Sequence, residues 1–441
     1  MKFKKDTVRT LLNSISIVVY SVLYLITVYF FYDKNVEFDY GVRGYIVLTL
    51  LYVLLLIAFH NLFRAFELGN KRISDLALSS TISLFFTDLV AYFILGLIEG
   101  HLVLVWPHLA LFAVQGLLSI WFSLYGTRIV RFNFPPKKVL LIHGPREYKV
   151  IVDKLKKYQK YEFDIVKSVL ETKIDYDKFS DLIKDYECVI TVEINHENKK
   201  NIVKTCYEND MHVYDVPSIL DVFINSAQST NFIDTPLFRL NRIGPSQLQR
   251  VIKRGIDIFG AVILLIIASP IMLISALIIK LQDGGDIFFK QKRLTLNNKE
   301  FYLVKFRSMI MNAEPEGKAI RAKVNDNRIT PFGKFIRRTR IDELPQVFNI
   351  LQGDLSFVGP RALRVEEYQQ NEKDFPEFKY RTKVKAGLTG YAQVYGKYNT
   401  SFRDKLLLDI YYIENYQISL DMRLILMTIA TMFSKDSSEG F

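Results

Sequence analysis

Four apolar stretches in the first third of the chain limit its fold more than any other feature. They cover roughly residues 11–32, 42–63, 78–99 and 102–125. Each is long enough to span the hydrocarbon core of a bilayer. The start, Met1-Lys2-Phe3-Lys4-Lys5, is basic, and no clear small-residue cleavage site follows the first stretch, which indicates an anchor and not a signal peptide. We therefore predict a region of four transmembrane helices.

The charges of the loops predict how these stretches cross the membrane. The first loop is acidic, with Asp33, Glu37 and Asp39 against Lys34. Basic residues gather in the second loop and after the fourth stretch: Arg64, Lys71, Arg72, Arg128, Arg131, Lys137 and Lys138. Loops rich in Lys and Arg stay on the cytoplasmic side. The N-terminus and the chain from residue 130 onward are therefore expected in the cytoplasm.

The composition agrees with a membrane protein that has a basic cytoplasmic face. Half of the residues are hydrophobic, yet the formal net charge is +12. No zinc-binding cluster or other familiar nucleic-acid motif is present, so we expect no nucleic-acid partner. The two cysteines, Cys188 and Cys206, form no disulfide framework and are expected to be reduced, buried thiols.

Residues 136–235 alternate between strand-like and helical patterns, which predicts a small α/β domain with a mostly parallel sheet. The strand-like runs lie at 137–144, 164–170, 187–193 and 211–215, and the helical ones at 147–159, 177–185 and 197–209. Gly144 stands alone before Pro145, and the G-x-G-x-x-G motif that cradles a dinucleotide phosphate is missing. We expect a degenerate, Rossmann-like scaffold or dimerisation module without NAD or FAD.

A further apolar run at residues 252–281 is long enough for a fifth span, but two features argue against one. Basic residues flank both of its ends: Lys253, Arg254, Lys280, Lys290, Lys292 and Arg293. Ser269-Pro270 lies in its middle, where proline removes a backbone donor and clashes with the preceding turn. We expect a helix broken at Ser269-Pro270 that enters and leaves on the cytoplasmic face. A kinked spanning helix is the alternative.

Two adjacent carboxylates, Asp342 and Glu343, follow a group of arginines at 337, 338 and 340. Arginines hold phosphate oxygens by bidentate bonds, and a carboxylate can attack phosphorus or bind Mg²⁺. No histidine or cysteine follows His212, so carboxylates are the leading catalytic candidates in the C-terminal half. The stretch alone also fits an ordinary helix start, with the acids at the positive end of the helix dipole and Pro345 in the first turn.

Six blocks between residues 245 and 433 resemble the bacterial sugar transferases, which are polyprenyl-phosphate hexose-1-phosphate (phosphoglycosyl) transferases. They are Lys253-Arg254 through Asp257 with the Ser-Pro pair, Lys305-Phe306-Arg307-Ser308-Met309, Thr330-Pro331-Phe332-Gly333, Asp342-Glu343-Leu344-Pro345-Gln346, Gly353-Asp354 to Arg361, and Gly387-Leu388-Thr389-Gly390. Their order and spacing are specific, whereas any single block would be weak. One block departs from the family, because the usual Gly-Pro-Arg-Pro reads Gly359-Pro360-Arg361-Ala362 here.

The resemblance to the larger members of this family implies a domain plan. Four transmembrane helices (1–135) precede the Rossmann-like domain (136–235) and a monotopic α+β catalytic domain (236–441), which contains the re-entrant hairpin at 252–281. It places the chain in the bacterial inner membrane as a multi-pass protein with a cytoplasmic catalytic domain. A homodimer is expected, and polysaccharide assembly proteins are further candidate partners.

The resemblance also implies a reaction and residues that carry it. A hexose 1-phosphate, glucose or galactose phosphate by analogy, would pass from a UDP-sugar to undecaprenyl phosphate with release of UMP. Asp342 would be the nucleophile that forms a phosphosugar-Asp intermediate, and Glu343 would hold Mg²⁺ with it and assist catalysis, with Mn²⁺ as a substitute. Phosphate contacts would come from Arg337 and Arg361, and the other candidate phosphate ligands are Lys305, Arg307 and Arg340.

Two other functions fit parts of the sequence. A membrane glycosyltransferase would transfer the sugar alone and release UDP, so the nucleotide product separates it from a phosphoglycosyl transferase. A non-catalytic scaffold for polysaccharide assembly would have no need of the intact Asp342-Glu343 pair.

Overall fold

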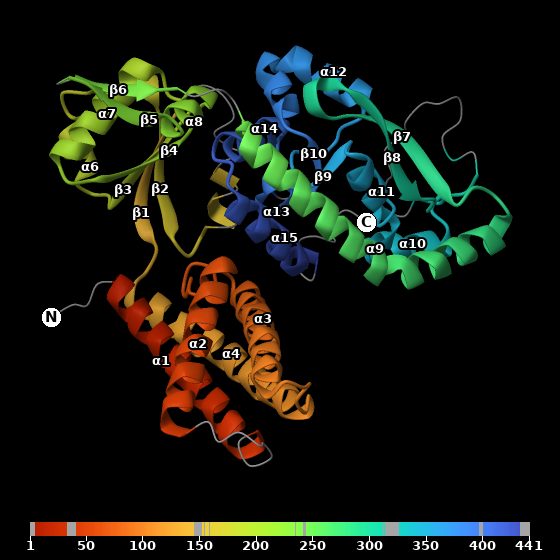
Figure 1. The fold of residues 1–441 in the computed structure, drawn as a ribbon. Helices are drawn as coiled ribbons and strands as arrows, with labels where there is room; N and C mark the ends of the chain where they lie inside the picture. The colour runs from red at the N-terminus through yellow and green to blue at the C-terminus, as the bar shows by residue number, and fades with distance from the viewer. Residues whose placement is uncertain are drawn as a thin grey trace. The chain divides into compact units, whose positions relative to one another are not determined.

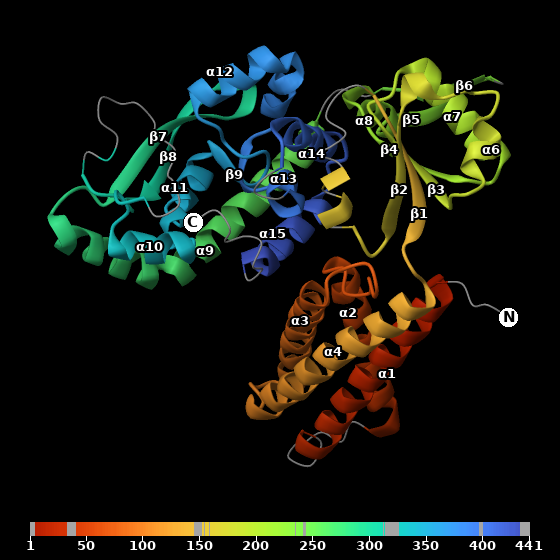
Figure 2. The same ribbon diagram turned by 180° about the vertical axis from the view of Figure 1, so that it is seen from behind.

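The computed structural model describes residues 5–32, 41–144, 152–153, 155–157, 159–233, 235–240, 244–311, 313, 326–396 and 400–432. The chain divides into two compact units, Met1–Pro217 and Ser218–Phe441, which are considered separately (Figures 1 and 2). The domain limits expected at residues 135 and 235 stay a prediction.

The first unit begins with four long apolar helices. They are α1 (Lys5–Phe31), α2 (Gly41–Leu62), α3 (Ile73–Glu99) and α4 (Trp106–Asn133). Each is long and apolar enough to cross a membrane, as the sequence predicted. Helix α1 packs against α2 and α4, and α3 packs against the same two helices, so the four close into a bundle (Figure 1). The acidic loop at residues 33–40 lies outside the described residues.

Polar side chains from the four helices meet inside this bundle. The Tyr52 hydroxyl of α2 donates a hydrogen bond to Asp88 Oδ1 of α3 at 2.9 Å. Gln115 Nε2 of α4 donates to the Tyr52 hydroxyl at 2.9 Å and to the Tyr20 carbonyl of α1 at 3.1 Å. Because a bilayer interior offers no water to satisfy polar groups, such interhelical bonds select one arrangement of the helices.

The rest of the first unit contains a parallel sheet, as predicted. Its strands are β1 (Lys137–His143), β2 (Phe163–Leu170), β3 (Cys188–Val192) and β4 (His212–Val216), in the order β2-β1-β3-β4. Leu140 and Ile142 of β1 pack into one apolar cluster, with residues of α6 (Phe179–Ile183) and α7 (His196–Glu208). Val139 and Leu141 pack into another, so the central strand is buried on both faces. Cys188 and Cys206 are free and buried. Most of the helix predicted at 147–159 lies outside the described residues.

The second unit is an α+β structure. Its elements are α8 (Ile219–Asn225), β5 (Gln228–Phe232), β6 (Thr235–Arg239), α9 (Gln247–Asp283), β7 (Phe288–Leu294), η3 (Leu296–Asn298), β8 (Glu300–Phe306), α10 (Pro331–Arg338), η5 (Ile341–Glu343), α11 (Gln346–Gln352), β9 (Leu355–Val358), α12 (Val365–Asp374), η6 (Pro376–Lys383), β10 (Ala386–Thr389), α13 (Tyr391–Tyr395), α14 (Phe402–Glu414) and α15 (Ile418–Met432). Strands β5 and β6 and strands β7 and β8 form antiparallel hairpins, whereas β9 and β10 pair in parallel.

The core of this unit is built on α9. Its buried residues Ala261, Ala268, Met272 and Ile279 pack in one cluster with residues of β8, α10, α11 and β9. Most other apolar residues of α9 are exposed, as expected for a helix that faces lipid on one side. The helix therefore contacts the elements that flank the Asp342-Glu343 pair while it keeps an apolar outer face.

The interruption predicted at Ser269-Pro270 takes the form of a bend within one continuous helix (Figure 1). Pro270 cannot donate to the Ile266 carbonyl, its normal partner four residues earlier. The Ser269 hydroxyl donates to that carbonyl instead, at 2.9 Å. The serine thus supplies the hydrogen bond that proline removes, and the helix bends without ending. That both of its ends lie on the cytoplasmic face stays a prediction.

Candidate active site

Asp342 and Glu343 lie in a single 3₁₀ turn, η5, between α10 and α11. Arg340, directly before this turn, has a left-handed backbone with φ of 59°. L-residues rarely adopt this conformation, and strain of this kind is commonly found at functional sites. It reverses the chain after α10 and makes the two carboxylates neighbours on a tight turn.

Glu343 is surrounded by cations from three segments. Lys305 of β8 donates to Glu343 Oε1 at 2.8 Å, Arg361 Nη2 lies 3.8 Å from the same oxygen, and Arg340 Nη1 lies 4.0 Å from Oε2. Burial alone would raise the pKa of Glu343, but the charges of Lys305, Arg361 and Arg340 outweigh it and lower that pKa to about 2. Glu343 is therefore a permanent anion at neutral pH.

Asp342 is in the opposite electrostatic situation. Burial and the negative charge of Glu343 raise its pKa to about 6, although Lys305, Arg337 and Arg340 act against this shift. Within the described part of the chain, no hydrogen bond is found to its carboxylate. Two neighbouring carboxylates thus differ widely in pKa, and only one of them is held by partners. This arrangement suits a reactive carboxylate beside a fixed one.

Arg337 lies on the last turn of α10, a short helix that Thr330 caps by accepting a hydrogen bond from Gly333 N at 2.9 Å. Arg337 Nε donates to Ser308 Oγ at 2.7 Å, and burial lowers the pKa of this guanidinium. The structure therefore brings Arg337 close to the Asp342 turn. Arg307, predicted for the same role, forms an ion pair with Asp283 at the end of α9 instead.

Arg361 follows β9 on a loop that is held tightly against β10. Gly359 N donates to the Thr389 carbonyl at 2.9 Å, and Gly387 N donates to the Pro360 carbonyl at 3.0 Å. A Cβ atom on Gly387 would lie 2.1 Å from Gly359 N, so only glycine allows this approach. The block that ends at Arg361 and the block that begins at Gly387 are therefore in direct backbone contact.

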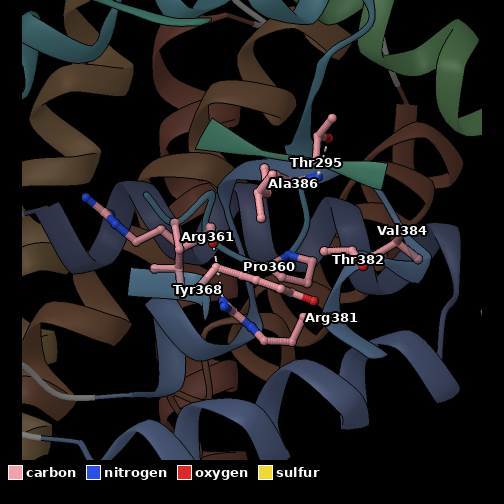
Figure 3. Close-up of a pocket in the computed structure, with 10 residues that line it drawn as sticks. Thr295, Pro360, Arg361, Tyr368, Arg381, Thr382, Val384 and Ala386 are labelled. Carbon is pink, nitrogen blue, oxygen red and sulfur yellow. Dashed lines mark hydrogen bonds between the residues drawn. The ribbon is translucent and has the colours of Figure 1, made fainter. Parts of the chain in front are cut away.

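A second support of Arg361 was not predicted from the sequence. Arg381 Nη2 donates to the Arg361 carbonyl at 3.3 Å, and Arg381 Nε donates to the buried carboxylate of Asp409 at 2.6 Å. Figure 3 shows Arg381 turned toward the backbone of Arg361, whose own side chain extends the other way. Arg361 and Arg381, but not Asp409, line a pocket of about 270 Å³, which includes open solvent. The Arg361 side chain itself is half exposed.

A pocket of about 300 Å³, which includes open solvent, lies at Glu343, Lys305 and Arg361. Arg293 of β7 also lines it, donates to the Ala362 carbonyl at 2.9 Å, and has a pKa lowered to about 10 by burial and by Arg361 and Arg364. Sequence reasoning treated Arg293 only as part of a basic flank. Residue type alone did not indicate its place, which depends on how β7 packs. Ser269 and Pro270 are not among the residues of this pocket.

Asp342 and Glu343 could hold a magnesium ion only together with ligands from outside the described side chains. Mg²⁺ is usually held by one or two carboxylates together with substrate phosphates. No group of three or more His, Cys, Asp or Glu side chains in the described residues could hold a metal alone. Asp342 and Glu343 can offer carboxylate oxygens, and a bound phosphate group or water would have to supply the other ligands.

Comparisons with known proteins match the part of the chain that contains this turn. A family model described as bacterial sugar transferase matches residues 248–435. A UDP-N-acetylgalactosamine-undecaprenyl-phosphate N-acetylgalactosaminephosphotransferase of Aeromonas hydrophila is 41% identical over 199 residues, 44% of this chain and 47% of that protein. A UDP-glucose:undecaprenyl-phosphate glucose-1-phosphate transferase of Klebsiella pneumoniae is 34% identical over 244 residues, 54% of this chain and 52% of that protein. An exopolysaccharide production protein of Rhizobium leguminosarum bv. phaseoli is 36% identical over 43% of this chain and 98% of that protein. The chain thus spans about half the length of the first two relatives and nearly all of the third.

The backbone of Arg340 gives a prediction about stability. Arg340→Gly and Arg340→Ala both remove the guanidinium, but only glycine relieves the left-handed conformation, so the glycine variant should be more stable by about 1 kcal/mol. The measurement is the free energy of unfolding of the purified protein. Arg338, in the last turn of α10, is the matched control, because alanine should be the more stable substitution within a helix. Equal stability of the two Arg340 variants would show that the turn is not strained.

Proposed function

The chain belongs to the bacterial sugar transferase family, and we propose that it transfers a hexose 1-phosphate from a UDP-sugar to undecaprenyl phosphate and releases UMP. The observation that carries the proposal is the Asp342-Glu343 turn. Its two carboxylates have pKa values of about 6 and about 2, and cations from three segments surround the second one. Such a site can neutralise a pyrophosphate and still present a reactive carboxylate.

The proposed reaction has two steps. In the first, an Asp342 carboxylate oxygen attacks the β-phosphorus, and the bond from that phosphorus to the bridging oxygen breaks, so that UMP leaves with the bridging oxygen. In the second, an oxygen of undecaprenyl phosphate attacks the same phosphorus and breaks its bond to Asp342. The products are undecaprenyl-diphosphate-sugar and a free Asp342 carboxylate. A covalent intermediate allows the soluble and the lipid substrate to be used one after the other.

Most of the predicted residues have a place in this scheme. Arg337 and Arg361 would bind donor phosphate oxygens, with Arg340 beside them, and Lys305 would keep Glu343 oriented and ionised. Mg²⁺, or Mn²⁺ in its place, would bind Asp342 and Glu343 and supply charge neutralisation at the diphosphate. Arg307 is less suited to this role because Asp283 is its partner.

The proposed setting is a bacterial plasma membrane, where this reaction would initiate exopolysaccharide, capsule or O-antigen synthesis. The catalytic domain would be cytoplasmic, because UDP-sugars are cytosolic and the basic loops point there. Glucose or galactose phosphate is the proposed cargo. A homodimer in contact with membrane lipids and polysaccharide assembly proteins is the proposed assembly.

Replacing the nucleophile tests the two-step reaction. Asp342→Asn keeps the shape of the side chain but removes its charge, so UMP release should fall by roughly 10³-fold or more. A UDP-sugar labelled in the β-phosphate, given without lipid acceptor, should label the wild type and not the variant. Undecaprenyl phosphate should then discharge the label. Release of UDP instead of UMP would support a glycosyltransferase, and fast turnover without any retained label would favour direct attack by the lipid phosphate.

The acid limb of activity should report the pKa of Asp342. Because the carboxylate must be ionised to attack and its pKa is raised to about 6, kcat/KM should fall as the pH drops through about 6. Lys305 lowers the pKa of both carboxylates, so Lys305→Met should shift this limb to higher pH. Lys299→Met is the control, since Lys299 is an exposed residue that pairs with Asp354. A limb that does not move in Lys305→Met would contradict the assignment.

The topology of α9 can be measured with single cysteines in a background without Cys188 and Cys206. Leu248→Cys and Asp286→Cys place exposed thiols at the two ends of the helix. If both ends are cytoplasmic, an impermeant thiol reagent added outside intact cells should label neither position, and lysed cells should give labelling at both. Labelling of position 286 alone in intact cells would mean that α9 spans the membrane.

A further inference from the structure

Arg254, near the start of α9, contacts the helix that follows the catalytic turn. Its Nη1 and Nη2 atoms donate to the carbonyls of Ile350 and Leu351 at 2.5 and 2.7 Å. These carbonyls belong to the last turn of α11, where donors four residues later run out, and Ile350 otherwise accepts only a cap bond from Gly353 N at 3.0 Å in the described residues. Helix α11 begins three residues after Glu343, so a residue of the apolar helix α9 holds the far end of the segment that carries the two carboxylates.

Asp257, one turn later on α9, holds a different segment. Its buried Oδ1 atom accepts hydrogen bonds from Ser356 Oγ at 3.0 Å and from Phe357 N at 3.1 Å. Both donors belong to β9, the strand that leads into the Arg361 loop. A Cβ atom on Gly260 would lie 2.9 Å from the Phe357 ring, so glycine allows α9 to lie this close to β9.

The two segments held by α9 carry opposite sides of the catalytic site. Segment η5–α11 carries Glu343, and β9 leads to Arg361, whose Nη2 atom is 3.8 Å from Glu343 Oε1. The guanidinium of Arg254 and the carboxylate of Asp257 are therefore used inside the protein. In the sequence, Arg254 stood out only as a basic residue beside the apolar run and as part of the block that runs to Asp257.

We propose that Arg254 and Asp257 are positioning residues through which α9 sets the spacing between Glu343 and Arg361. The position of the apolar helix is then part of the catalytic geometry and not only an attachment to the membrane. A displacement of about 1 Å between catalytic groups can lower a rate by roughly 10²-fold. This inference rests on the proposed function, because its effect is read in the transferase reaction.

A double-mutant cycle on the full chain in lipid nanodiscs tests the proposal. Arg254→Ala and Asp257→Ala should each lower kcat for UMP release by roughly 10- to 100-fold, with a smaller change in the KM for UDP-sugar. If these residues act by positioning Arg361, the same substitutions in an Arg361→Ala background should lower kcat only by about threefold or less. A general loss of stability would lower kcat by the same factor in the wild-type and the Arg361→Ala backgrounds.

Conservative and matched variants complete the design. Arg254→Lys keeps the charge but can donate from only one nitrogen, so its kcat should stay well below that of the wild type. Asp257→Asn keeps an acceptor oxygen and should retain most of the wild-type kcat. Arg250→Ala removes an exposed charge from the same end of α9 and should leave kcat unchanged. Should Asp257→Ala fail to fold, Ser356→Ala removes one of the two bonds and should show the same non-additivity with a smaller loss.

Two results would overturn the proposal. One is equal factors in both backgrounds. The other is full activity of Arg254→Lys together with losses that follow the anionic lipid content, which would make Arg254 a headgroup contact. If either result is obtained while the wild-type protein releases UMP, the positioning proposal fails and the proposed function stands. A wild-type protein that releases no UMP with any UDP-sugar would instead end the proposed function.

Discussion

The ionised carboxylate of Glu343 is the group on which the arrangement of the second unit depends. A buried charge is expensive unless it is paired and hydrogen-bonded, and here β8, the turn after α10 and the loop after β9 each bring one cation to it. Removing any one of these segments would leave Glu343 with less compensation for its burial. Asp342, its neighbour in the chain, gains no hydrogen bond in the described residues, and burial together with the charge of Glu343 raises its pKa to about 6. The cost of burying one carboxylate is thus offset, and the other remains available for chemistry.

Local patterns made much of this structure predictable. Apolar length indicated the four N-terminal helices, and the alternation of strand-like and helical runs indicated the parallel sheet. The adjacent acids and the arginines before them indicated a candidate site, because their chemistry is local to one turn. Proline in α9 indicated a discontinuity, but the sequence did not indicate that Ser269 would replace the missing hydrogen bond and let the helix continue.

What could not be predicted depends on contacts between residues far apart in the chain. Lys305 and Arg307 are only two residues apart in the chain. Lys305 nevertheless pairs with Glu343, whereas Arg307 pairs with Asp283. Arg381 and Asp409 support the Arg361 loop from elements that carry no recognisable motif. Arg293 looked like one more basic residue in a flank, and only the packing of β7 brings it to the pocket at Glu343. In each case the partner is chosen by tertiary packing, which residue type alone does not determine.

The polar residues inside the four-helix bundle have a consequence for its biogenesis. Tyr20, Tyr52, Asp88 and Gln115 come from four successive helices, and the Gln115 amide joins α1 to α2. The network can therefore be completed only when the last of the four helices has left the ribosome and entered the bilayer. Until then the first three helices hold an unfinished polar centre, which the insertion machinery has to shield from lipid. Because α4 is synthesised last, the bundle reaches its final hydrogen-bonded arrangement only when α4 packs into it.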